Sequence, residues 1–263
     1  MSGFDKDWLA LREPADVRAR NQALLKAAIE AAESASATAI LDIGCGTGST
    51  FRALSPRLRK PAHFRLFDYD PRLLDEAQRQ HGNAVEIVQG DLNQIGALPL
   101  ADISLVTASA LFDLCSEEFI RRFVARLSQT AASLYAALNY DGRMRWSKPH
   151  PLDEAVVANF NAHQLGDKGF GFSLGPRAWE TLTACLKGGG YATTTAESPW
   201  VMTADDRGLQ LSFLDGVVRA VYEYAQLDEN EIRDWADFRR RMVDRDGSLC
   251  EVGHQDILAI RRG

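Results

Sequence analysis

The sequence lacks the features that mark several common classes of protein. Its 263 residues include four cysteines (Cys45, Cys115, Cys185 and Cys250), which form no C-x-x-C pair and no cluster with histidine. This spacing argues against a structural zinc site and against a disulfide scaffold. No apolar run approaches the length of a membrane span, and the first residues alternate charged with apolar side chains instead of forming a signal-peptide core. We therefore expect a cytoplasmic protein with no bound metal and no membrane partner.

An excess of positive charge is also missing. The formal net charge is -6, and the densest basic cluster, Arg239–Arg241, lies among aspartates. Proteins that bind nucleic acids usually carry a strong basic patch, so the charge favours a small-molecule substrate over RNA or DNA. We expect a monomer or a homodimer.

What the sequence does contain is a regular alternation of short apolar strands with amphipathic helices. Strands are predicted over residues 39–43, 63–67, 85–88, 103–107, 133–138, 191–196 and 249–260. Helices are predicted over residues 16–32, 49–58, 71–77, 117–127, 154–161, 176–186, 208–224 and 229–243. Such alternation predicts an α/β fold, a doubly wound, Rossmann-like and mostly parallel seven-stranded sheet with helices on both faces.

We expect a single domain over residues 1–263 with three added segments. Residues 1–35 are predicted to form an N-terminal helical lid. Residues 140–175 and 199–247 interrupt the strand–helix alternation and are predicted to be cap insertions that determine specificity. A lid and a cap suit a sequestered small molecule better than a polymer. A dimer interface is the alternative use of these helices.

The strongest local signal is a glycine loop after the first strand, Asp42-Ile-Gly44-Cys-Gly46-Thr-Gly48. Glycines let the backbone turn sharply and approach a ligand, and the following helix directs its N-terminal amides at that ligand. The loop by itself predicts a nucleotide-like cofactor. Ser49 stands where the dinucleotide fingerprint has its third glycine, and no Gly-Lys-Ser/Thr follows, so a nicotinamide enzyme and a P-loop are both disfavoured.

The complete loop resembles motif I of the class I S-adenosylmethionine-dependent methyltransferases. Three later stretches resemble that family in order and spacing: Leu66–Ala77, which contains Asp68, then Gly90-Asp91-Leu92, and Ala101–Ser109. The resemblance covers roughly residues 36–140 and implies S-adenosyl-L-methionine as the cofactor. The cofactor-binding residues it implies are Asp42, Gly44, Cys45, Gly46, Gly48, Asp68, Tyr69, Asp91, Leu92 and Ser109.

In the family, the acid at the position of Asp68 binds the ribose hydroxyls, and the acid at Asp91 takes the adenine amino group. Structural interpretations stay open beside these roles. Asp42 is alternatively a buried acid that ties loop amides together. Cys45 is alternatively a small packing residue, and Asp70 is better read as a helix cap.

The methyl acceptor is not named by any motif. Alignment of nucleophile, methyl carbon and sulfur can lower the barrier by roughly 7–11 kcal/mol without a dedicated catalytic residue. No Asn/Asp-Pro-Pro-Tyr/Phe follows the fourth strand and no cysteine follows a proline, so base-modifying chemistries are disfavoured. The prediction is methyl transfer to an O, N or S of a small metabolite. The alternatives are a non-catalytic scaffold or sensor that binds S-adenosylmethionine, or transfer of another group from it.

Three candidate catalytic residues follow the fourth and fifth strands, on the predicted cofactor side of the sheet. Asp113 and Asp141 are candidates for a general base or for binding a cationic substrate, although each has a loop cap as its alternative reading. Tyr140 is a candidate for shaping the acceptor pocket, and packing on the core is its alternative.

Overall fold

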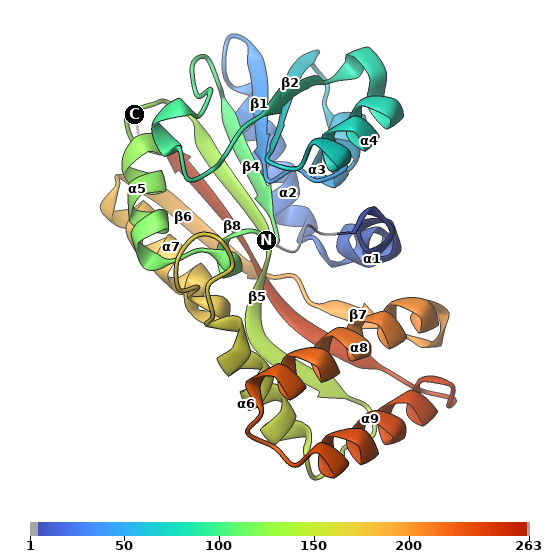
Figure 1. The fold of residues 1–263 in the computed structure, drawn as a ribbon. Helices are drawn as coiled ribbons and strands as arrows, with labels where there is room; N and C mark the ends of the chain where they lie inside the picture. The colour runs from blue at the N-terminus through green and yellow to red at the C-terminus, as the bar shows by residue number, and fades with distance from the viewer. Residues whose placement is uncertain (1–4, 262–263) are drawn as a thin grey trace.

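The computed structural model describes residues 5–261, and one twisted sheet lies at its centre (Figure 1). The strand order is β3-β2-β1-β4-β5-β8-β6, and a short β7 pairs with β8. The strands are β1 (Thr38–Ile43), β2 (Ala62–Asp68), β3 (Glu86–Gln89), β4 (Leu105–Ser109), β5 (Ser133–Trp146), β6 (Tyr191–Glu197), β7 (Trp200–Met202) and β8 (Cys250–Arg261). Strands β1 to β5 pair in parallel, and β8 is antiparallel to β5, β6 and β7. The predicted mostly parallel seven-stranded sheet is confirmed, and β7 adds a short strand that the pattern does not predict.

Helices cover both faces of this sheet. Helices α2 (Gln22–Glu33), α3 (Ser49–Leu54) and α4 (Pro71–His81) share one hydrophobic core with Ile40 and Leu105. Helices α5 (Glu117–Leu127) and α7 (Ala178–Gly188) share a second core with Leu41 and Val106. Neighbouring strand residues point to opposite faces, so two buried faces require the continuously apolar strands found in the sequence. Short 3-10 turns cover Ser55–Arg57, Gly82–Ala84, Ile95–Ala97, Phe112–Leu114, Gly175–Arg177 and Ala204–Asp206.

The outer halves of β5 and β8 extend beyond the sheet and carry a cap (Figure 1). We define the cap as those outer halves together with β7, α6 (Asp153–Gln164), α8 (Arg207–Tyr224) and α9 (Glu229–Val243). These elements, joined by α1 (Lys6–Ala19), bury a third core around Trp200 and Trp235. The two predicted insertions therefore meet in one structure.

The expectation of an irregular insertion from residue 140 is wrong at its start, because β5 continues to Trp146. Met144 pairs with Val252, and Trp146 pairs with Cys250. The register of this pairing shifts between Ala136 and Asn139 and again between Tyr140 and Met144. Such bulges interrupt the two-residue alternation of side chains. Because strands are predicted from this alternation, the sequence does not show how far β5 continues.

The expectation of one helix over residues 16–32 is also wrong, because the chain forms two helices, α1 and α2, that break at Arg20 and Asn21. The Asn21 side chain accepts hydrogen bonds from the backbone N–H groups of Ala23 and Leu24, and so caps α2. The backbone N–H of Asn21 itself donates to Asp256 of β8 at 2.9 Å. The first four residues of the predicted lid lie outside the described residues.

No helix between residues 5 and 261 combines the length and the apolar character needed to cross a membrane.

Candidate functional site

A cleft of about 920 Å³ opens at the carboxyl ends of β1, β2, β3 and β4. Five segments line it: the glycine loop, residues 68–73, residues 91–93, the end of β4, and residues 167–170; α1 covers it from the cap side. Parallel α/β sheets bind ligands at this edge. The volume lies near the upper end of the range for small-molecule sites, so the cleft can hold a nucleotide-sized molecule together with a second, small one.

The glycine loop passes close to neighbouring side chains. Gly44, Gly46 and Gly48 have φ angles of +62°, +54° and +85°. A Cβ atom on Gly46 would lie 3.1 Å from Leu9 of α1, and one on Gly48 would lie 2.9 Å from the ring of His81. Any other residue at these positions would be strained and crowded. Gly44, Cys45 and Gly46 line the cleft, whereas Gly48 lies at its back.

Asp68, at the end of β2, organises the loop and also lines the cleft. Its Oδ2 accepts the backbone N–H of Gly46 at 2.9 Å, and its Oδ1 accepts the backbone N–H of Asp70 at 3.0 Å. Tyr69 lines the cleft beside it and is half exposed. Asp70 caps α4 by accepting the N–H of Arg72, in agreement with its reading as a helix cap.

Asp91 and Leu92 follow β3 and line the same edge. Asp91 Oδ1 accepts the backbone N–H and the side-chain amide of Asn93, at 2.9 and 3.1 Å. The amide of Asn93 also donates to the carbonyl of Gly169 at 3.1 Å. This contact joins the edge after β3 to residues 167–170, which belong to the predicted insertion over 140–175 and line the cleft.

Asp42 lies behind the loop and does not line the cleft, which agrees with its structural alternative. Its Oδ1 accepts the hydroxyl of Thr107 at 2.7 Å, whereas its buried Oδ2 has no partner among residues 5–261. Burial raises the pKa of Asp42 to about 7, against the opposing effects of the Thr107 hydrogen bond and the Arg20 charge. Burial likewise holds the pKa of the Cys45 thiol well above its usual range, so Cys45 is a packing group and not a nucleophile.

None of the three candidate catalytic residues is part of the cleft lining, and two of them, Tyr140 and Asp141, belong to β5. Asp141 accepts the backbone N–H of Arg143 at 3.1 Å and its guanidinium at 2.9 and 2.6 Å. Its Oδ2 also accepts the amide of Gln255 at 3.3 Å. The hydroxyl of Tyr140 donates to Asn161 of α6 at 2.8 Å. Both polar groups are therefore committed to partners within the protein.

Asp113 follows β4 in the turn Phe112–Leu114. Leu111 and Leu114, on either side of it, line the cleft, although Asp113 itself does not. Its Oδ1 is buried and has no hydrogen-bond partner within the described part of the chain. Burial raises the pKa of Asp113 to about 6, against the effects of its own backbone N–H and of the Arg12 charge. Of the three candidates it is the one whose carboxylate is free to accept a proton beside the cleft.

Helix α1, within the segment predicted as a lid, contributes Leu9, Arg12 and Asp16 to the lining, and the sequence did not single out Arg12 or Asp16 as site residues. Arg12 and Asp16 are four residues apart, a spacing that in sequence resembles an ordinary surface ion pair. In the structure only 11% of the Arg12 side chain and 7% of the Asp16 side chain are exposed. Burial of the pair, and not its spacing, distinguishes it from a solvated helix face.

Comparison with known proteins agrees with this geometry. Residues 40–132 match the family model described as a methyltransferase domain. The matched stretch runs from β1 to the residue before β5 and includes the glycine loop, Asp68 and Asp91. No curated protein matches the sequence closely enough to count as a relative.

Two solved structures are similar to this chain in fold. The chain is similar to the cyclopropane synthase MmaA2 from Mycobacterium tuberculosis, with 14% identity and a TM-score of 0.54, over 97% of this chain and 94% of that one. It is also similar to the YcgJ protein from Bacillus subtilis, with 16% identity and a TM-score of 0.52, over 92% of this chain and 100% of that one. At this level of identity the similarity concerns the fold, and it agrees with the predicted doubly wound, Rossmann-like α/β architecture.

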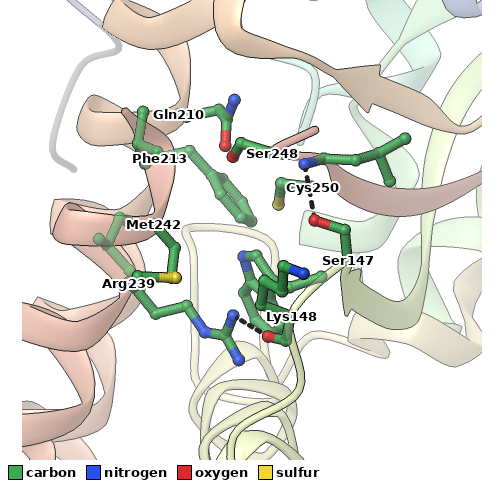
Figure 2. Close-up of a pocket in the computed structure, with 12 residues that line it drawn as sticks. Ser147, Lys148, Gln210, Phe213, Arg239, Met242, Ser248 and Cys250 are labelled. Carbon is green, nitrogen blue, oxygen red and sulfur yellow. Dashed lines mark hydrogen bonds between the residues drawn. The ribbon is translucent and has the colours of Figure 1, made fainter. Parts of the chain in front are cut away.

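A second pocket lies inside the cap, outside the methyltransferase domain (Figure 2). Arg239 donates to the carbonyl of Lys148 at 2.7 Å, and the backbone N–H of Leu249 donates to Ser147 at 3.0 Å across its floor. Its volume of about 20 Å³ is enough for one water molecule and not for a substrate. The functional cleft is therefore the one at the sheet edge.

Residues 5–261 contain no group of three or more histidine, cysteine, aspartate or glutamate side chains placed to hold a metal ion.

Proposed function

We propose that the chain binds S-adenosyl-L-methionine in the cleft and transfers its methyl group to a small molecule. One observation carries this proposal: the glycine loop, Asp68, Asp91-Leu92 and Ser109 meet around a single cleft at the carboxyl edge of the sheet in a methyltransferase domain. When bound, the cofactor supplies an electrophilic methyl group on a sulfonium. The chain supplies binding, orientation and exclusion of water.

The residues present fit that cofactor. Gly44 and Gly46 leave room for a ligand against the loop backbone, where a Cβ atom would crowd Leu111 and Leu9. The Asp68 and Asp91 carboxylates line the cleft and accept hydrogen bonds, as binding of ribose hydroxyls and of an adenine amino group requires. We propose that Gly48 and Asp42, which are not part of the cleft lining, support the conformation of the loop.

Apolar side chains on the acceptor side of the cleft suit the exclusion of water, and one candidate base lies beside them. Leu9, Leu111, Leu114 and Phe170 form apolar walls there. An oxygen or nitrogen acceptor that keeps its proton must lose it during transfer, and we assign its removal to Asp113, whose neighbours Leu111 and Leu114 line the cleft. Since burial raises the pKa of Asp113 to about 6, its base form predominates at neutral pH.

We propose an O, N or S acceptor, with carbon as the second candidate because one similar structure is a cyclopropane synthase. We also propose that the N-terminal segment and the insertions over 140–175 and 199–247 determine which acceptor enters. A cytoplasmic location and a monomeric or homodimeric state remain predictions from the sequence.

A transfer assay tests this function. The chain is incubated with methyl-labelled S-adenosylmethionine and a panel of small oxygen, nitrogen and sulfur nucleophiles, and S-adenosylhomocysteine is measured. We expect acceptor-dependent product, reduced at least tenfold by Asp113→Asn and little changed in kcat by the matched Asp141→Asn. Binding of the cofactor without transfer to any member of the panel would instead favour a scaffold or sensor.

A further inference from the structure

A buried polar cluster of three residues joins α1 to the cap at the wall of the cleft. Asp16 accepts Nε of Arg12 at 2.9 Å and Nη2 of Arg12 at 3.1 Å. The same carboxylate accepts the indole N–H of Trp200 at 2.8 Å. The guanidinium lies over the Trp200 ring, 4.9 Å from its centroid. One edge and one face of Arg12 are thus fixed by the protein.

The opposite edge of the guanidinium is not used by the protein. An arginine side chain carries five N–H donors, and the contacts with Asp16 use two of them. Nη1 has no hydrogen-bond acceptor among residues 5–261, and Arg12 lines the cleft. A guanidinium whose orientation is fixed on one edge is preorganised to bind a planar anion on the other.

Arg12 lies on the acceptor side of the cleft and not on the cofactor side. Its guanidinium packs on Trp200 of β7, in the cap, and its charge acts to lower the pKa of Asp113 in the turn after β4 and of His254 in β8. A different arginine, Arg20, lies behind the glycine loop, where Nη2 donates to Thr50 at 3.3 Å and to Ser109 at 3.2 Å. The two cations therefore serve different halves of the cleft.

The other cations of the lining are placed elsewhere. Arg72 is paired with Asp70, and Lys168 belongs to the segment that Asn93 holds at the edge after β3. Arg12 shares the cleft with the apolar side chains of Leu111 and Leu114. A cation at the end of an apolar compartment complements a molecule with an apolar body and an anionic group.

We propose that Arg12 anchors the carboxylate of the acceptor, so that the substrate class of this methyltransferase is small carboxylic acids with an apolar body. This inference rests on the proposed function. Asp16 and Trp200 are positioning residues, because they hold Arg12 and act on the ligand through it. A carboxylate in the cleft has a second source, the amino-acid end of the cofactor, and the experiment separates the two.

The test compares acids with their uncharged amides. Benzoate and phenylacetate, and then benzamide and phenylacetamide, are titrated into the chain saturated with S-adenosylhomocysteine, with calorimetry and tryptophan fluorescence as readouts. We expect both acids to bind at least tenfold more tightly than their amides. Arg12→Met is expected to remove this preference, while Arg12→Lys, which keeps the charge and loses the planar fork, lowers it at least fivefold. Arg18→Met, on the exposed side of the same helix, is the matched control and is expected to keep it.

A second arm identifies the source of the carboxylate. S-adenosylhomocysteine and 5'-methylthioadenosine, which lacks the amino-acid carboxylate, are titrated into the wild-type chain and into Arg12→Met. We expect less than a twofold change for either ligand. Weaker binding of S-adenosylhomocysteine alone would assign Arg12 to the cofactor and overturn the proposal, as would equal binding of acids and amides, or no binding of either acid, in the wild-type chain.

Failure of the proposed function has a different result. If the wild-type chain does not bind S-adenosylhomocysteine, the proposed function fails, and the acids and amides are then titrated into the free protein to decide the role of Arg12.

Discussion

Burial controls the charge of the carboxyl groups next to the cleft. Asp42 and Asp113 each carry a buried oxygen without a partner in the described chain, and burial raises the pKa of both. Asp68 and Asp141 lie in the same region, but each of their carboxylates accepts at least two N–H groups. The number of hydrogen-bond partners therefore distinguishes two kinds of carboxylate. Asp68 and Asp141 hold the loop and the strands in place, whereas Asp113 is able to exchange a proton.

The raised pKa of Asp113 has a consequence for stability. A carboxyl with a higher pKa in the folded than in the unfolded protein holds its proton more tightly when folded, so the free energy of unfolding falls as pH rises from about 4 through about 6. A shift of this size corresponds to about 1–3 kcal/mol. We expect Asp113→Asn to be more stable than the wild-type chain by about that amount at pH 8, and the gain to disappear near pH 4.

Urea unfolding at several pH values measures this difference. Asp141→Asn, which removes acceptors from a satisfied carboxylate, serves as the control and is expected to destabilise the protein at pH 8. A wild-type slope that persists toward pH 7 is expected from Asp42, whose pKa is raised in the same direction. An Asp113→Asn variant less stable than the wild-type chain at pH 8 would contradict the account.

Individual residues of the site differ in how far the sequence predicts them. Glycines at fixed spacing and an acid after the second strand have a conformational and chemical reason that is local, and Gly44, Gly46 and Asp68 could be placed in advance. The contribution of Arg12 depends on where α1 docks. No local pattern predicts that docking, because an arginine and an aspartate four residues apart look the same in the sequence whether their helix is exposed or covers a cleft.

Helix α1 is the element whose position matters most for the cleft. Arg52 of α3 donates from Nε and Nη2 to Glu13 of α1, both at 2.5 Å, and from Nη1 to the carbonyl of Thr47 in the glycine loop at 2.6 Å. The Arg52 guanidinium thus connects α1, which covers the cleft, to the glycine loop, which lines it. About a quarter of the Arg52 side chain and a fifth of the Glu13 side chain are exposed, so solvent partly screens the pair.

Arg52→Met is expected to loosen α1 selectively. Loss of a half-buried bidentate pair should lower the free energy of unfolding by about 1 kcal/mol. Amide hydrogen exchange should speed up over residues 6–19 with little change in the central strands. Arg18→Met, which breaks an exposed pair with Asp206, is the control, with an expected effect below about 0.5 kcal/mol. Equal loss of protection in α1 and β1 would show that the contact does not act locally.

Elements with uninterrupted patterns were predicted best. The helix over residues 229–243 and the order of the parallel strands follow directly from hydrophobic spacing and caps. The split between α1 and α2 depends on a contact between Asn21 and Asp256, which lie far apart in the sequence. The length of β5 depends on pairing with β8 across two bulges. Long-range contacts of this kind produce no periodic pattern in the sequence from which they could be predicted.

The whole molecule is joined by strands shared between its two halves. β5 and β8 pair within the central sheet through Leu134 and Ala259, and within the cap through Trp146 and Cys250. Because the same two strands serve both cores, we expect one cooperative unfolding transition and not separate melting of the cap. The sequence suggests two insertions, and only the folded chain shows that they build one cap on these strands.

Trp235→Ala tests that cooperativity. Trp235 is completely buried in the cap core, and its truncation should cost about 3–5 kcal/mol. Urea unfolding followed by far-ultraviolet circular dichroism and by tryptophan fluorescence should give coincident transitions in both proteins, at lower urea in the variant. Two separate transitions in Trp235→Ala, with the central sheet keeping its wild-type midpoint, would show that the cap folds independently.

The most direct test of the central claim is a calorimetric titration with S-adenosylmethionine and, separately, with NAD. We predict binding of S-adenosylmethionine in roughly the micromolar range and none of NAD, with at least a tenfold loss, about 1.4 kcal/mol, in Asp68→Ala. Asp75→Ala, on the exposed side of α4, should bind as the wild-type chain does. Absence of S-adenosylmethionine binding by the folded wild-type protein, or unchanged binding by a folded Asp68→Ala variant, would contradict the assignment of the cleft.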